Sequence, residues 1–226
     1  MMGAYKVGVA ANSHNYTEQV GACVGGTILY PYVSWIITNC INRGIDRVYF
    51  IARDGYILKK IADIIIQRNG FHIQTKYIYG SRKAWRISEN DKEKWDFLLE
   101  YIDQEIDMSN DHYAFVDING TGYTFSIFVK AMNTIHQTTA TIFYYGMNAI
   151  ASYDNSNFII YSSLKDAHYV ELLCRAPEAA VCGYKKVDTT IMPQFIEKEQ
   201  MRWKSTAVEA FNRGVEKFSD ILSTLE

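Results

Sequence analysis

Three times along this chain, a short apolar run rich in β-forming residues ends in a polar loop and leads into a helical segment. The runs are 47–52 (RVYFIA), 76–80 (KYIYG) and 112–117 (HYAFVD), and further strands are expected at 140–145 and 157–162. Strands that alternate with helices predict a parallel sheet, because each crossover helix must pack on a face of that sheet. The sequence therefore predicts a three-layer, mainly parallel, Rossmann-like α/β fold with about five strands.

Helical periodicity marks the segments around these strands. Residues 27–42 predict a largely buried helix over one face of the sheet, and 56–68 and 91–107 predict amphipathic helices. From Pro193 onward, apolar residues recur at roughly helical intervals, which predicts a long helix or a helix pair; they are Phe195, Met201, Trp203, Val208, Phe211, Val215 and Phe218. We expect an α/β domain at 1–192 and a C-terminal helical appendage at 193–226.

Composition excludes some functions. A formal net charge of −2 with both signs scattered along the chain gives no basic surface for nucleic acid. The four cysteines form no CxxC pair, which argues against a structural zinc site. The sequence shows no signal peptide and no continuous apolar run of the roughly 18 residues that a membrane span needs, so we expect a cytoplasmic protein without a membrane span.

The polar loops that follow the three strands are the candidate functional site. They contain Arg53-Asp54-Gly55, Ser81-Arg82 and the segment from Asp117 to Thr124. In an open parallel sheet, loops and helix N-termini converge beyond the carboxyl ends of the strands, so these loops should face one crevice. Arg53 and Arg82 are natural partners of phosphate or carboxylate oxygens, and Asp54 is the candidate general acid or base.

The loop after the third strand is the most specific of the three. It reads FVDINGTGYT at 115–124 and resembles the phosphoribosyl-pyrophosphate loop of the phosphoribosyltransferases, in which two acids precede a Thr-Gly-x-Thr turn. The resemblance implies a phosphoribosyltransferase-like sheet in which Asp117 binds sugar hydroxyls or Mg²⁺. It also implies a phosphate cradle made by Asn119, Gly120, Thr121, Gly122, Tyr123 and Thr124. The first acid is Val116 here, and a turn with capping threonines is the alternative interpretation.

The loop after the first strand is similar to that of haloacid-dehalogenase-like phosphatases, which carry an Asp-x-Asp-Gly-Thr run. Here the first aspartate is replaced by Ala52, so the nucleophile of such a phosphatase is missing. Asp54 and Ser81 would match that family's acid/base and phosphate-contacting residues. The alternative is that Asp54 only caps the following helix.

A wider resemblance spans about residues 20–184. It rests on GIDRVYFIARDGYILKKI, YIYGSRKAW, FVDINGTG and ELLCRAPEAAVCGY in that order. These blocks resemble the C-terminal region of large bacterial haloacid-dehalogenase-superfamily hydrolases associated with surface-polysaccharide biosynthesis. The resemblance implies a surface-glycan context with a polysaccharide-assembly protein as partner, and it favours Glu171 as a further site residue.

These observations predict binding, and transfer or cleavage, of a phosphorylated sugar or nucleotide-sugar. The alternative is a non-catalytic interaction domain that retains the phosphate-cradle fold without the acid at Val116 or a nucleophile at Ala52, and that docks a partner through the aromatic helix face near Trp203. An active phosphatase is disfavoured by Ala52.

Overall fold

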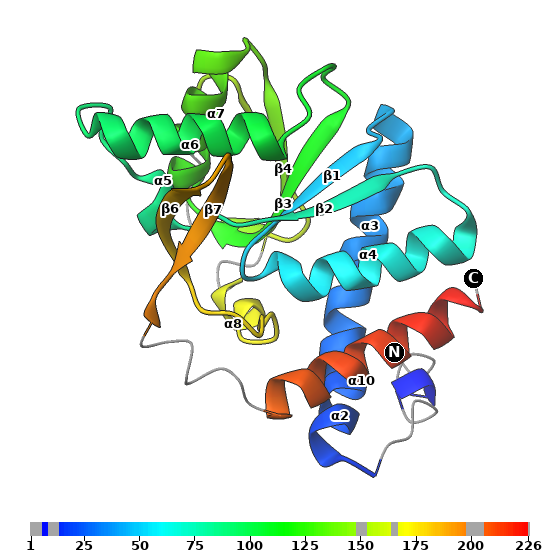
Figure 1. Ribbon diagram of the computed structural model, residues 1–226. Coiled ribbons are helices and arrows are strands. Elements are labelled where there is room, and N and C mark those ends of the chain that lie inside the picture. The colour runs from blue at the N-terminus through cyan, green and yellow to red at the C-terminus, as the bar shows by residue number, and fades with distance from the viewer. Residues whose placement is uncertain (1–5, 9–13, 148–152, 164–166, 198–205, 226) are drawn as a thin grey trace.

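The computed structural model describes residues 6–8, 14–147, 153–163, 167–197 and 206–225 (Figure 1). Its centre is a five-stranded sheet in the order β2-β1-β3-β4-β5, in which every neighbouring pair is parallel. The strands are β1 (Arg47–Ile51), β2 (Gln74–Ile78), β3 (Tyr113–Gly120), β4 (Ala140–Met147) and β5 (Ser156–Ile160). The predicted parallel α/β fold is confirmed.

The strand order sets where the chain leaves the sheet. β2 lies on one side of β1, and the chain then crosses to the other side of β1 to form β3, β4 and β5. Phe50 of β1 pairs with Val116 of β3, so the residues after β1 leave the sheet beside Asp117. Between β1 and β3 the direction of winding reverses, which opens a crevice at the carboxyl ends of these two strands.

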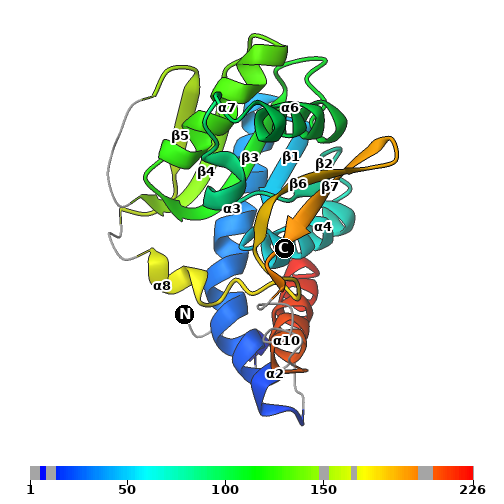
Figure 2. The same ribbon diagram turned by 60° about the vertical axis from the view of Figure 1, so that its left-hand side comes forward.

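Helices cover both faces of the sheet (Figures 1 and 2). α3 (Thr27–Arg43) and α4 (Gly55–Asn69) pack on one face, and α6 (Lys92–Glu105) and α7 (Tyr123–Ile135) lie on the other. Side chains alternate between these two cores along β3: Val116 belongs to the first and Phe115 to the second. This alternation is the period of two that a strand imposes.

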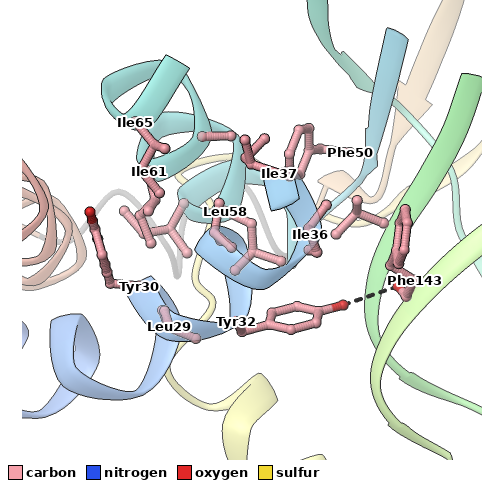
Figure 3. Packing of buried hydrophobic residues seen from close by; sticks show 14 of the residues in the cluster. Leu29, Tyr30, Tyr32, Ile36, Ile37, Phe50, Leu58, Ile61, Ile65 and Phe143 are labelled. Atoms are coloured by element: carbon pink, nitrogen blue, oxygen red, sulfur yellow. Dashed lines mark hydrogen bonds between the residues drawn. The ribbon is translucent and has the colours of Figure 1, made fainter. Parts of the chain in front are cut away.

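The core on the α3 and α4 face is drawn in Figure 3. Leu29, Ile36 and Ile37 of α3 interdigitate with Leu58 of α4 and Phe50 of β1, and all are almost completely buried. The Tyr32 hydroxyl donates to the carbonyl oxygens of Phe143 at 3.0 Å and Asp117 at 2.8 Å. A polar group of the core helix thus satisfies backbone acceptors where β3 and β4 approach the crevice.

The N-terminal helix is longer than the sequence predicts. α2 (Tyr16–Val20), the π-helical segment η1 (Gly21–Gly26) and α3 form one helical run, Tyr16–Arg43, which is long and apolar enough to cross a membrane. Roughly half of its most apolar window is buried inside the protein (56%). Its packing against the sheet is that of a core helix.

A second helix covers the part of this run that extends beyond the sheet. α10 (Thr206–Ser223) lies across α2 and η1 and also against α4 (Figure 1). The two backbones touch at Gly214, where an added Cβ would lie 1.9 Å from the carbonyl oxygen of Glu18. Lys217 of α10 pairs with the buried carboxylate of Glu18.

The expectation of helix from Pro193 onward is wrong for the first residues. Pro193 and Phe195 belong to β7 (Thr190–Phe195), which forms an antiparallel hairpin with β6 (Val181–Val187). Tyr184 of β6 stacks on Tyr101 of α6 and donates to the Tyr79 carbonyl at 2.7 Å, so the hairpin closes the second core. Met201 and Trp203 lie outside the described residues.

Candidate functional site

A polar cleft of about 340 Å³ lies at the carboxyl ends of β1, β2 and β3. All the predicted site residues except Gly55 and Tyr123 line it: Arg53, Asp54, Ser81, Arg82, Asp117, Asn119, Gly120, Thr121, Gly122, Thr124 and Glu171. The structure therefore brings the three predicted loops together, and Glu171 of the short helix α8 (His168–Glu171) joins them. That these residues bind a ligand stays a prediction.

The loop between β1 and α4 supplies Arg53 and Asp54. Asp54 occupies the N-cap position of α4, but within the described residues its side chain makes no capping hydrogen bond. The interpretation of Asp54 as a helix cap is therefore wrong. Gly55 packs behind the cleft, where an added Cβ would lie 2.6 Å from the backbone carbon of Phe50.

Asp54, Asp117 and Glu171 place three carboxyl groups within electrostatic reach of one another. Burial raises the pKa of Asp117 to about 7, and the charge of Glu171 adds to this, while the N–H of Ile118 and the charge of Arg82 oppose it. The pKa of Asp54 is raised well above its usual range by burial and by the negative charges of Asp117 and Glu171. The positive charges of Arg53 and Arg175 lower it, but by less. The cleft can thus retain a carboxyl proton near neutral pH.

β3 continues from Asp117 to Gly120, further than the sequence predicts, and only Thr121 and Gly122 separate the strand from α7. Gly122 is the residue before the helix and has a φ of +80°, and an added Cβ would lie 2.6 Å from the ring of Phe158. The N–H groups of the first turn of α7 have no acceptor within the helix and create a positive end there, which favours an anion. The Thr121 hydroxyl accepts a long hydrogen bond of 3.4 Å from the N–H of Tyr123, so the capping interpretation retains support for Thr121.

The loop after β2 has a structural role as well as a place in the cleft. Ser81 caps the short helix α5 (Arg82–Trp85) by accepting from the N–H groups of Lys83 and Ala84, and it donates to the Val181 carbonyl at 2.7 Å. Its hydroxyl is therefore already engaged. The exposed guanidinium of Arg82 is better placed to meet a ligand.

Sequence reasoning missed Arg86 and Tyr144, which also line the cleft. Arg86 lies one helical turn after Arg82, and its Nε donates to the Thr124 hydroxyl at 2.9 Å. Tyr144 is the β4 partner of Asp117, and burial followed by the charge of Asp117 raises its pKa well above the usual range. The i, i+4 spacing of Arg82 and Arg86 could have indicated from sequence that both lie on the same face of a helix. The place of Tyr144 in the cleft could not be predicted in this way, because it depends on β4 lying beside β3.

A metal site made by the protein alone is not present in the described part of the chain. No group of three His, Cys, Asp or Glu side chains there is arranged to hold a metal ion. Asp117 could contribute one carboxylate to a Mg²⁺ ion, and the remaining oxygen ligands would have to come from a bound phosphate and water.

A larger depression of about 740 Å³ lies at the amino ends of the strands, away from these loops. Both its arginine and its lysine are already paired with acids, because Arg47 pairs with Asp46 and Asp107, and Lys76 pairs with Glu105. The smaller cleft at the carboxyl ends is therefore the better candidate site.

Fold and cleft together define a parallel α/β protein with a polar cleft at its topological switch point. No protein-family model matches the chain, and no curated protein is similar enough to it to count as a relative.

Proposed function

We propose that the cleft binds the phosphorylated part of a sugar phosphate or nucleotide-sugar. One observation carries this proposal: Arg53, Arg82, Arg86 and the N-terminus of α7 converge on the same cleft as three carboxyl groups. Arginines and helix N-termini suit phosphate oxygens, whereas carboxyl groups suit the hydroxyls of a sugar.

Each group then has a role in binding. The N–H groups of residues 120–124 hold the phosphate, and Arg82 and Arg86 pair with its outer oxygens. Asp117 makes hydrogen bonds to sugar hydroxyls. Asp54, whose pKa is raised well above the usual range by burial and its acidic neighbours, donates a proton to the leaving oxygen if the protein is a transferase or hydrolase.

A Mg²⁺ ion fits this arrangement only together with the ligand. Asp117 would supply one carboxylate oxygen, and phosphate oxygens and water would complete the shell that magnesium prefers. The ion, when bound, would neutralise phosphate charge. We expect that Mg²⁺ alone leaves the protein's melting temperature unchanged.

The resemblance to haloacid-dehalogenase-superfamily proteins supports a proposal about the biological process in which the ligand is used. It favours a cytoplasmic step of bacterial surface-polysaccharide assembly, with an assembly protein as partner. The alternative is a non-catalytic interaction domain that retains the phosphate-cradle fold, and it is favoured by Val116 and Ala52 at the positions of the missing acid and nucleophile. Its expected docking face near Trp203 lies outside the described residues.

A thermal-shift screen tests the proposal. The ligands are glucose 1-phosphate, UDP-glucose and phosphoribosyl pyrophosphate, each with and without Mg²⁺, because a ligand that binds only the native state raises the melting temperature. We expect a shift for at least one of them that is lost in Asp117→Asn and in Arg82→Met.

Asp103→Asn is the matched control. Asp103 is an exposed carboxylate at the opposite edge of the sheet, so the shift should persist in this variant. No shift with any phosphorylated compound would contradict the proposal and favour the interaction domain.

A further inference from the structure

A row of aromatic side chains lies beside the mouth of the cleft and is not explained by sugar-phosphate binding. Tyr123, the first residue of α7, is 48% exposed. Its ring lies 6.3 Å from that of Tyr153, which in turn packs edge-on against Phe158 at 6.1 Å. This row borders the Asp117–Thr124 segment, because the ring of Phe158 also packs against Gly122.

Arg86 connects this aromatic row to the cleft. Its guanidinium carbon lies 5.0 Å from the centre of the Tyr123 ring, and its Nε donates to Thr124 inside the loop. One side chain therefore contacts the aromatic surface and lines the cleft at the same time. The planar guanidinium group of arginine and the aromatic ring of tyrosine both present flat faces on which a planar base can stack.

Arg86 thus joins an exposed aromatic surface to the cleft. Tyr123 lies outside the cleft lining, Arg86 contacts both Tyr123 and Thr124, and the carboxyl group of Asp117 is buried within the lining. A nucleoside diphosphate-sugar has a matching sequence of groups, because its base is joined to its sugar through the phosphates. A simple sugar phosphate has nothing to place on the outer aromatic surface.

We propose that Tyr123, together with Arg86, stacks the nucleobase of a nucleoside diphosphate-sugar whose phosphates occupy the Asp117–Thr124 loop. This inference rests on the proposed function and narrows its ligand class. Core packing does not account for the Tyr123 ring, because α7 buries Phe125 and Phe128 on its other side while half of Tyr123 remains exposed.

Calorimetric titration of the full chain with UDP, ADP, pyrophosphate and glucose 1-phosphate tests the inference. We expect UDP or ADP to bind the wild type about tenfold or more tightly than pyrophosphate, because stacking on an aromatic side chain contributes affinity of that order. Tyr123→Ala should lose about tenfold in nucleotide affinity with pyrophosphate affinity unchanged, and Tyr123→Phe should keep the nucleotide preference.

Tyr16→Ala is the matched control, since Tyr16 is likewise an exposed tyrosine at the first position of a helix. Equal affinity for nucleotides and pyrophosphate, or equal loss of both in Tyr123→Ala, would overturn the inference. If glucose 1-phosphate still binds in that case, the proposed function stands. If no phosphorylated compound binds, the proposed function and the inference both fail.

Discussion

The chemistry of the cleft depends most on the carboxyl group of Asp117. The side chain belongs to the second half of β3, and the N–H of Ile118 donates to its Oδ1 at 2.8 Å. One hydrogen bond and the charge of Arg82 do not offset burial and the nearby Glu171, so the pKa rises to about 7. The folded protein therefore holds a proton that the unfolded chain releases near pH 4.

This raised pKa predicts how stability changes with pH. Between about pH 4 and 7 the folded state binds more protons at Asp117 than the unfolded state, so the free energy of unfolding falls as pH rises. Asp117→Asn removes the carboxyl group whose ionisation destabilises the folded state at high pH. We expect the variant to melt a few degrees above the wild type at pH 8 and to lose that advantage by pH 4, as measured by thermal unfolding across pH.

Asp103→Asn should show no such difference, because Asp103 is exposed on α6. Asp54 titrates in the same direction, so the wild type and Asp117→Asn should both retain some loss of stability toward high pH. Identical pH profiles for the wild type and Asp117→Asn would contradict the buried, protonated carboxyl described here.

At the scale of elements, the sequence predicts the strands of the main sheet well. β1 and β3 are apolar runs long enough for a strand and too short for a helix, and each ends at a turn. Their order along the chain, strand then helix, was enough to predict that polar residues such as Asp54, Ser81 and Asp117 meet at one edge. The cleft lining confirms that they meet.

The hairpin and part of the cleft could not be predicted, for physical reasons. β6 carries the consecutive lysines Lys185 and Lys186, and β7 contains Pro193, so neither sequence reads as a regular alternation of apolar and polar residues. The hairpin is held by tertiary contacts such as Tyr184 on Tyr101. Tyr144 joins the cleft only because β4 lies beside β3, which the linear pattern does not state.

The crossing of η1 and α2 by α10 gives a prediction about packing. In Gly214→Ala the new Cβ would lie 1.9 Å from the Glu18 carbonyl oxygen and 2.8 Å from the Ala22 nitrogen, so the helices must separate. Overpacking typically costs about 1–3 kcal/mol, and the upper part of that range, about 2–3 kcal/mol, applies here because both clashing atoms belong to the backbone. The better helix propensity of alanine returns about 1 kcal/mol. We expect a net loss of about 1–2 kcal/mol in urea unfolding.

Glu209→Ala on the same helix is the control for this substitution. Glu209 is exposed, so the free energy of unfolding should change by less than about 0.5 kcal/mol. Equal stability of Gly214→Ala and the wild type would show that the two backbones are not in close contact.

At the scale of the whole molecule, α10 belongs to the fold through its buried side chains. Val215 and Phe218 of α10 are almost fully buried, and Phe218 packs edge-on against Tyr30 of α3. Burying two such side chains contributes roughly 3–6 kcal/mol, a large share of the roughly 5–15 kcal/mol of a typical protein. The helical run Tyr16–Arg43 therefore depends on α10 to shield part of its apolar surface from solvent.

Removal of residues 206–226 should expose the apolar side chains that α10 buries. We expect the truncated chain to aggregate or to melt at least 10 °C lower, with Ala22 and Tyr30 newly exposed, in size-exclusion chromatography and thermal unfolding. Truncation after Thr224 is the control, because Leu225 is largely exposed. A soluble truncated chain with the melting temperature of the full chain would contradict this role of α10.

The pairing of Tyr16–Arg43 with α10 also sets an order of events on the ribosome. The helix Tyr16–Arg43 packs against α10 only after the chain as far as Ser223 has been synthesised, roughly 10–30 s later at ordinary rates of translation. During that interval its glycine-rich, apolar surface is exposed to other nascent chains. We expect newly made protein to bind a chaperone that recognises apolar nascent segments and to be released only after α10 has been translated.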